Sequence, residues 1–185
     1  MGYGPSAPVP IFQHEAEFTR LLKLYRERKP RNVLEIGTYH GGTLYHWLSN
    51  APLGAHVVSV DSYAVGVDNR HLYPEWARDG IDLTVIEGDS HDPQVIAKVR
   101  QLAPYQWLFI DADHYYEPVK QDWESYGPMV EEGGVVCFHD ILEDLASHPE
   151  IEVRRLWEEI KEKHRTEEIV ESERNAWGGI GIVFK

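Results

Sequence analysis

Short apolar segments alternate with amphipathic ones along most of this 185-residue chain, and this alternation limits its fold more narrowly than any other feature. Five apolar runs have the length of buried strands: residues 33–36, 56–60, 83–87, 107–110 and 135–138. Helical spacing of apolar residues is found at residues 14–29, 43–49, 93–102 and 118–130. Strands that alternate with helices pair in parallel through right-handed crossovers, so the pattern predicts a doubly wound α/β domain.

The last twenty residues depart from this alternation. Residues 168–172 and 181–184 both have strand character, and the segment between them is too short for a parallel crossover. The final strand should therefore run antiparallel, within a closing hairpin over residues 166–185. The charged segment 151–165 is expected to form an amphipathic surface helix before the hairpin. The elements together predict a mostly parallel seven-stranded sheet with an antiparallel last strand.

The length suits a single domain over residues 1–185. Its first part, residues 1–13, is rich in Pro and Gly and is expected to form an arm that is mobile or laid over a partner. Residues 63–80 form the longest irregular connection between predicted elements, and we expect them to act as a lid over a site.

Composition excludes several classes of function. Acidic residues outnumber basic ones 31 to 18, a formal net charge of −13, which argues against nucleic acid or an anionic membrane as partner. The only cysteine, Cys137, excludes an intrachain disulfide and a cysteine-based zinc site. The sequence has neither an apolar run of about 18 residues nor a secretory pattern at its start. A cytoplasmic protein is the expectation.

Acidic residues stand at the ends of successive predicted strands. They are Glu35, Asp61, Asp89, Asp111 and Asp140, the last of them preceded by His139. The carboxyl ends of parallel strands share one edge of a sheet, where ligands bind at the point of reversal in strand order. Because an unpaired charge beside an apolar run is costly, these residues predict a ligand site; the alternative for any one of them is a helix N-cap.

Residues 35–43 (Glu-Ile-Gly-Thr-Tyr-His-Gly-Gly-Thr) read as a tight turn that opens a helix, whose backbone N–H groups can hold an anionic group. The dinucleotide fingerprint is not met, because Gly37 is followed by a glycine only at position 41. Glu35 would repel a pyrophosphate but suits an ammonium or sulfonium charge. Asp61, about 20 residues after the turn, is placed to hold ribose hydroxyls. A ribose-bearing ligand with a cationic, zwitterionic tail indicates S-adenosylmethionine.

Residues 33–42 (Val-Leu-Glu-Ile-Gly-Thr-Tyr-His-Gly-Gly) resemble motif I of the class I S-adenosylmethionine-dependent methyltransferases. Residues 58–61 (Val-Ser-Val-Asp) and 87–90 (Glu-Gly-Asp-Ser) resemble the ribose-binding and adenine-binding motifs of that family. Residues 109–116 (Phe-Ile-Asp-Ala-Asp-His-Tyr-Tyr) and 133–140 (Gly-Gly-Val-Val-Cys-Phe-His-Asp) are similar to its small-molecule O-methyltransferase branch, which includes catechol, macrolide-sugar and cephalosporin-type enzymes. The likeness covers about residues 31–142, which would be the cofactor-binding and catalytic core of a Rossmann-like methyltransferase fold.

The resemblance implies transfer of a methyl group from S-adenosylmethionine to a hydroxyl of a small molecule, of sugar or natural-product type. The residues it implies for cofactor binding are Glu35, Gly37, Thr38, Thr43, Asp61, Ser62, Asp89, Ser90 and Asp111. His114 matches the general base of the family, and an unperturbed histidine pKa of about 6.5 suits that task. Asp111 and Asp140 match metal ligands.

Two positions depart from the family pattern. His139 stands where the antibiotic-sugar enzymes have a carboxylate, and Ile141 stands where catechol-type enzymes have a metal-binding amide. Asp111, His139 and Asp140 could still hold Mg²⁺ or another divalent ion, although an imidazole shifts the preference toward transition metals. The alternative is that His139 is an acid–base or hydrogen-bonding residue beside Asp140, with no metal.

Two other functions stay open on the sequence. A nicotinamide-dependent oxidoreductase is disfavoured by the missing fingerprint and the antiparallel last strand, and a non-catalytic nucleoside-binding module would keep the same fold. Only the arm and residues 63–80 and 142–150 are left to shape an acceptor pocket. We therefore hypothesise a homo-oligomer, formed through the arm or the first helix, in which a partner subunit completes the site.

Overall fold

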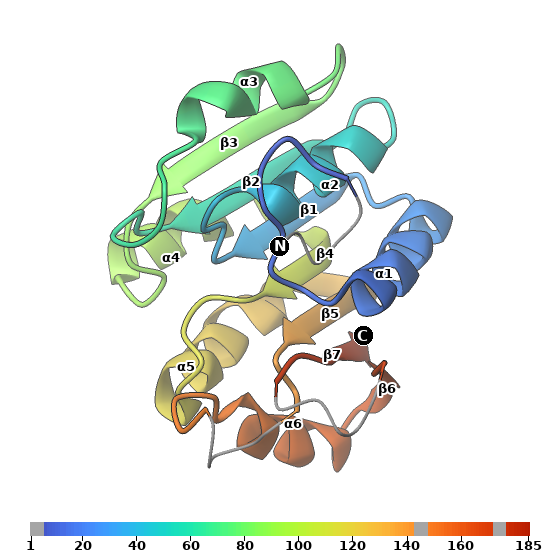
Figure 1. Ribbon diagram of the computed structural model, residues 1–185, viewed down its shortest axis with the longest axis vertical. Coiled ribbons are helices and arrows are strands. Elements are labelled where there is room, and N and C mark those ends of the chain that lie inside the picture. The colour runs from blue at the N-terminus through green and yellow to red at the C-terminus, as the bar shows by residue number, and fades with distance from the viewer. Residues whose placement is uncertain (1–5, 143–147, 172–176) are drawn as a thin grey trace.

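The computed structural model (Figure 1) describes residues 6–142, 148–171 and 177–185. Its sheet has seven strands in the order β3-β2-β1-β4-β5-β7-β6. The strands are β1 (Asn32–Ile36), β2 (His56–Asp61), β3 (Asp82–Glu87), β4 (Tyr105–Ile110), β5 (Val130–His139), β6 (Arg165–Ile169) and β7 (Ile180–Phe184). Strands β1 to β5 pair in parallel, and β7 pairs antiparallel with both β5 and β6. The predicted mostly parallel seven-stranded sheet with an antiparallel last strand is confirmed.

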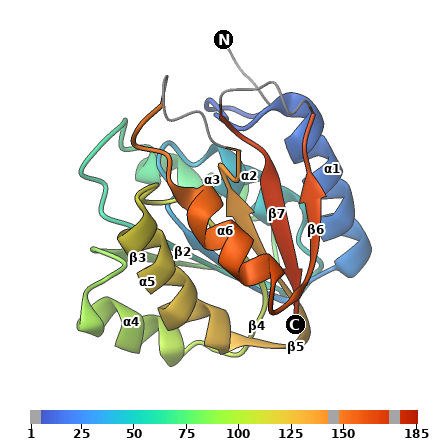
Figure 2. The ribbon, with the colours of Figure 1, turned by 90° about the horizontal axis from the view of Figure 1, so that it is seen from below.

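Helices cover both faces of this sheet (Figures 1 and 2). The helices are α1 (Glu15–Arg28), α2 (Gly42–Asn50), α3 (Tyr73–Trp76), α4 (Pro93–Arg100), α5 (Tyr116–Tyr126) and α6 (Val153–Lys161), with short 3-10 turns η1 (Arg70–Leu72) and η2 (Gly127–Met129). Helices α1 to α3 pack on one face and α4 to α6 on the other. In the described part of the chain, every helix is too short or too polar to cross a lipid bilayer.

The alternation of side chains along each strand divides the apolar residues between two cores. In β1, Val33 packs under α1 and α2, whereas Leu34 packs under α4 to α6. The first core is built around Trp47 and Trp107, and the second around Phe138 and Trp157, all fully buried. Each such side chain stabilises the fold by roughly 2–3 kcal/mol on burial. A strand covered on both faces needs apolar residues at successive positions, which explains the continuous apolar runs in the sequence.

Several predicted boundaries are wrong. The helix predicted over 118–130 spans Tyr116–Tyr126; Pro128 has no N–H to continue the α-helical hydrogen bonds, and the 3-10 turn η2 follows. The strand predicted over 135–138 begins five residues earlier, because Val130 already belongs to β5. The helix predicted over 151–165 ends at Lys161. Strand β6 begins at Arg165, three residues before the predicted start; it lies at the sheet edge, where charged side chains are tolerated. Ser172, the predicted end of that strand, lies outside the described residues.

Two segments predicted as irregular are held against the domain. Within residues 63–80, η1 and α3 form, and the side chains of Tyr73 and Trp76 are buried in the core beside α2. Of the predicted arm, residues 6–13 are described, and they lie along the carboxyl edge of the sheet with Ile11 buried in the same core. Buried apolar side chains therefore hold both segments against the same domain, beside the ends of its strands.

Candidate active site at the carboxyl edge of the sheet

The strand order reverses between β1 and β4, and a cavity of about 790 Å³ lies at the carboxyl ends of the strands there. Segments that follow β1, β2, β3, β4 and β5 line it, together with arm residues Pro10 to Gln13. This volume is typical of a site for a small organic ligand. The position is the one expected for ligands in an open α/β sheet.

The loop after β1 depends on glycine. Gly37 has a φ of +87°, and a Cβ there would overlap the carbonyl oxygen of Asp111 at the end of β4. Gly41, with a φ of +89°, precedes the first turn of α2, where Thr43 lines the cavity. The absence of side chains thus lets the loops after β1 and β4 lie against one another.

Asp61, at the end of β2, holds this loop in place. Its Oδ2 accepts hydrogen bonds from the backbone N–H groups of Thr38 (2.8 Å) and Tyr39 (2.7 Å). Its Oδ1 accepts a third from Tyr63, at 2.5 Å. The sequence predicted a ribose contact for Asp61, which stays a prediction; the role as anchor of two loops was missed, because nothing local in the sequence signals it.

Glu35 lies behind the loop. It alternates with Leu34 and Ile36 along β1, so its side chain points into the layer of α1 and α2. There it is fully buried and accepts a hydrogen bond from Trp47 Nε1, at 2.8 Å, and burial raises its pKa to about 8. Its carboxylate does not line the cavity, so its predicted contact with a charged ligand stays a prediction that this geometry does not favour.

The other predicted cofactor residues come together around the cavity. They are Gly37, Thr38, Thr43, Asp61, Ser62, Asp89, Ser90 and Asp111. At the β3 end, Asp89 accepts a hydrogen bond from the backbone of His91 (2.9 Å). The ring of His91 also lies 3.4 Å from Asp122, which is fully buried and whose pKa burial raises to about 6. This network fixes the segment predicted to border adenine.

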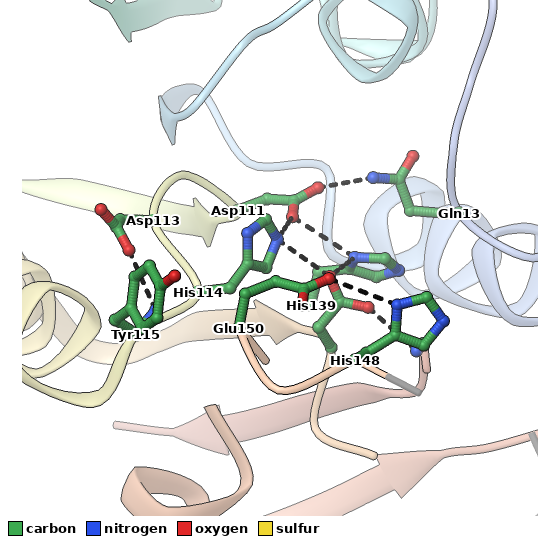
Figure 3. Close-up of polar contacts among 10 residues, drawn as sticks. Gln13, Asp111, Asp113, His114, Tyr115, His139, His148 and Glu150 are labelled. Atoms are coloured by element: carbon green, nitrogen blue, oxygen red, sulfur yellow. Dashed lines mark hydrogen bonds and ion pairs between the residues drawn. The ribbon is translucent and has the colours of Figure 1, made fainter. Parts of the chain in front are cut away.

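At the opposite end of the cavity lie Asp111, His114, His139 and Asp140, of which Figure 3 labels the first three. His139 Nδ1 lies 3.3 Å from Asp111 Oδ1 and 3.1 Å from Asp140 Oδ2. His114 Nε2 lies 2.9 Å from Asp140 Oδ2 and 3.6 Å from Asp111 Oδ1. The ends of β4 and β5 thus bring together the predicted base and all three predicted metal ligands. We call these four residues the Asp–His cluster.

The charges of the Asp–His cluster perturb one another. Burial lowers the pKa of His114, but hydrogen bonds and charges from Asp111 and Asp140 outweigh it and raise that pKa to about 10. The same carboxylates raise the pKa of His139 well above its usual value, against the effect of burial. In return, burial would raise the pKa of Asp111 and Asp140, but the histidines lower both. The two carboxylates thus stabilise the charged form of both imidazoles.

Gln13 of the arm is a site residue that the sequence did not reveal. Its Nε2 donates a hydrogen bond to Asp111 Oδ2 (2.5 Å), and its side chain is 5% exposed (Figure 3). Trp177 and His148 line the same cavity. Gln13 lies in no periodic segment or motif, so only the fold could bring it to Asp111.

Comparison with known sequences gives two matches. The sequence profile of the "Methyltransferase domain" family matches residues 34–141, more than half of the chain. Among curated proteins, the uncharacterized protein R132 of Acanthamoeba polyphaga mimivirus is 27% identical over 118 residues, which make up 62% of this chain and 53% of that protein. The chain thus spans about half the length of the curated relative it matches.

Solved structures share the fold. An O-methyltransferase from Bacillus cereus, in complex with SAH (S-adenosylhomocysteine), has a TM-score of 0.65 at 20% identity, over 92% of this chain and 80% of that one. The MycE methyltransferase from the mycinamycin biosynthetic pathway, in complex with Mg and SAH, has a TM-score of 0.61 at 19% identity, over 94% of this chain and 50% of that one. At these identities the similarity establishes the fold.

Proposed function

Because the chain belongs to the methyltransferase domain family, we propose that it transfers a methyl group from S-adenosylmethionine to a hydroxyl of a small molecule. The observation that carries this proposal is the convergence of every predicted cofactor residue except Glu35 on one cavity. The structural neighbour from Bacillus cereus, an O-methyltransferase in complex with SAH, supports the choice of cofactor and of oxygen as the methylated atom.

The cavity offers suitable groups for each part of this cofactor. The start of α2, with Thr43, would hold the methionine carboxylate, because N–H groups at a helix start attract anions. Asp61 would take the ribose hydroxyls, and Asp89 with Ser90 would border adenine. When bound, the cofactor would supply an electrophilic methyl group on a positively charged sulfur. Gly37 lies against the main chain of Asp111, so the loop proposed for the cofactor adjoins the Asp–His cluster.

The acceptor hydroxyl must lie in line with the methyl group and must lose its proton. We propose the Asp–His cluster for this step. His114, the predicted base, is its more accessible imidazole, with a side chain 35% exposed against 3% for His139. Asp111 and Asp140 stabilise the protonated form of His114, which cannot act as a base. A cation that neutralises one of these carboxylates would favour the neutral imidazole, which can accept the proton of the hydroxyl.

The cluster fits such a cation. Asp111, His139 and Asp140 each offer one donor atom, and these atoms lie within 4.8 Å of one another. A divalent ion there would act as a Lewis acid toward the acceptor hydroxyl. The neighbour MycE, in complex with Mg and SAH, supports metal assistance.

The part of the cavity left for the acceptor is lined by both apolar and polar side chains. The exposed side chains of Phe12, Tyr39 and Val65 line the cavity together with the polar cluster. We propose an acceptor with an apolar face and at least one hydroxyl, consistent with a natural product or a decorated sugar. The hypothesis of a partner subunit at this site remains a proposal, which light scattering on the intact chain tests.

Isothermal titration of the purified chain with S-adenosylhomocysteine, and separately with NAD, tests the cofactor. We expect heat with the first ligand and none with the second; the reverse result would replace methyl transfer by nicotinamide chemistry. Incubation with labelled S-adenosylmethionine and a panel of catechols, sugars and phenolic natural products then tests turnover. Binding without transfer to any panel member would support a non-catalytic nucleoside-binding module.

A further inference from the structure

We propose that His91 and Asp122 set the base selectivity of the cofactor site, by holding Asp89 so that its carboxylate accepts a hydrogen bond from the exocyclic amino group of adenine. Both are positioning residues, because they act through Asp89, which lines the cavity. The inference rests on the proposed function, since it specifies how the adenine end of that site distinguishes adenine from other purines.

Helix α5 supports the loop that follows β3. Tyr126 Oη donates a hydrogen bond to the carbonyl oxygen of Ser90, at 2.6 Å. The imidazole Nε2 of His91 lies 3.1 Å from the carbonyl oxygen of Pro118 and 3.4 Å from Oδ1 of Asp122. Three residues of one helix therefore fix the loop that carries Asp89.

The imidazole of His91 bridges Asp122 and Asp89. A carbonyl oxygen can only accept a hydrogen bond, so the contact with Pro118 requires a proton on Nε2. On the other side of the ring, Nδ1 lies 3.1 Å from Oδ1 of Asp89, and this carboxylate oxygen favours a proton on Nδ1 as well. With both protons, the ring carries a positive charge between two carboxylates.

Asp122 is a buried carboxyl group that core packing does not explain. Its side chain is fully buried, yet neither of its oxygens has a hydrogen-bond partner of good geometry among the described residues. Burial raises its pKa to about 6, and Ser90 and His91 act against that effect. Because a buried carboxylate is costly unless a cation pairs with it, the contact with His91 indicates what the charge of Asp122 holds in place.

The contacts of Asp89 leave one of its oxygens for a ligand. Oδ1 accepts a hydrogen bond from the backbone N–H of His91 (2.9 Å) and lies beside the imidazole of the same residue, so Oδ2 is the oxygen that remains. The side chain of Asp89 is 69% exposed. A carboxylate oxygen only accepts hydrogen bonds, so it matches the amino group of adenine and opposes the oxygen that hypoxanthine carries at the same position. A site built around one donor discriminates against an analogue that lacks it.

Calorimetric titration with S-adenosylhomocysteine and with S-inosylhomocysteine, in which hypoxanthine replaces adenine, tests the selectivity without any activity measurement. We expect the parent to bind S-adenosylhomocysteine at least about tenfold more tightly. Asp122→Asn and His91→Ala should each lower that affinity about fivefold or more and leave the affinity for S-inosylhomocysteine within about twofold. A role confined to the stability of the loop would weaken both ligands equally and keep their ratio.

Two further variants show through which residue Asp122 acts. In an Asp89→Ala background, Asp122→Asn should change neither affinity by more than about twofold, since its effect passes through Asp89. Glu124→Gln is the matched control: it neutralises an exposed carboxylate of the same helix and should leave both affinities unchanged. Asp122→Asn keeps the shape of the side chain and removes a buried charge, so we expect it to fold as the parent does, which thermal unfolding verifies.

The outcomes separate this inference from the proposed function. Equal affinity of the parent for the two ligands, or an unchanged preference in Asp122→Asn and His91→Ala, would overturn the inference and leave the proposed function standing. A further loss on adding Asp122→Asn to Asp89→Ala would also overturn it. Failure of the parent to bind either nucleoside would overturn the proposed function, and the inference with it.

Discussion

Trp47 donates a hydrogen bond from its indole Nε1 to Oε1 of Glu35 across 2.8 Å, and both side chains are fully buried beneath the glycine loop. Burial raises the pKa of Glu35 to about 8, so the folded protein keeps this carboxyl group protonated at neutral pH. The unfolded chain ionises it near its ordinary value of 4.5. The burial of this carboxyl group, which outweighs the opposing effect of the hydrogen bond from Trp47, therefore couples the stability of the fold to pH.

The free energy of unfolding should fall as pH rises through this interval. Because the pKa of Glu35 is higher in the folded state, its contribution is complete below about pH 4.5 and is lost by about pH 8. The loss is on the order of 5 kcal/mol. Glu35→Gln keeps an acceptor for Trp47 and removes the titration, so its urea midpoint should vary less between pH 5 and 9 than that of the parent. Parallel pH profiles for the two proteins would contradict this account.

Gln13→Ala removes the N–H donor to Asp111 Oδ2 and frees that carboxylate to turn. We expect metal affinity to fall about tenfold or more, as when other orienting partners of metal ligands are lost. Affinity for S-adenosylhomocysteine should fall less than affinity for the metal, since other residues, at the ends of β2 and β3, make the predicted ribose and adenine contacts. Gln13→Glu, which places a second carboxylate beside Asp111, should disturb the site at least as much. Metal affinity equal to that of the parent in both variants would exclude a positioning role.

Glu17→Ala should destabilise the fold through the C-terminal hairpin. Glu17, fully buried on α1, accepts hydrogen bonds from the backbone N–H groups of Glu171 and Gly179, both at 2.8 Å. Loss of the carboxylate leaves two N–H groups unpaired, at a cost of about 2–4 kcal/mol in the free energy of unfolding. The exposed Glu15 is the matched control, and Glu15→Ala should cost less than about 1 kcal/mol. Urea denaturation distinguishes the two variants, and equal midpoints would refute the anchoring role.

Comparison of Gly37→Ala with Gly54→Ala should separate the effect of a steric clash from the cost of a positive φ. A Cβ at Gly37 overlaps the main chain of Asp111, so we expect loss of S-adenosylhomocysteine binding by at least about tenfold and a clear drop in stability. Gly54 also has a positive φ, of +77°, but a Cβ there meets only Arg31, at 3.7 Å. Gly54→Ala should therefore cost about 1 kcal/mol and leave binding intact. Similar binding in the two variants would show that the clash is relieved elsewhere.

Most of the sheet and much of the site could be predicted from the sequence, because both depend on local signals. A buried strand needs a continuous apolar run, and an acidic residue that interrupts or ends such a run is visible without the structure. Asp111 and Asp140 were found in this way, and β4 and β5 bring them together with His139. Glu35 carries the same signal but serves the core, because strand alternation turns its side chain away from the cavity.

The residues that the sequence did not reveal act over long chain distances. Gln13 and Asp111 are separated by 98 positions, and neither periodicity nor a motif connects them. The start of β6 was misplaced for a related reason: Arg165 and Glu167 are charged, and only pairing with β7 at the sheet edge makes them part of a strand. Tertiary contacts outweigh local pattern at these positions.

The hydrogen-bond donors that hold Asp111 and Asp140 also determine when the site can form during synthesis of the chain. Gln13 precedes the region shared with the family, residues 34–141, and Gly178 follows it. A nascent chain that has left the ribosome only as far as residue 141 already carries Asp111, His139 and Asp140, yet it lacks the backbone N–H of Gly178 that holds Oδ1 of Asp140. The orientation of the Asp140 carboxylate thus depends on a residue that is translated only after the whole region shared with the family.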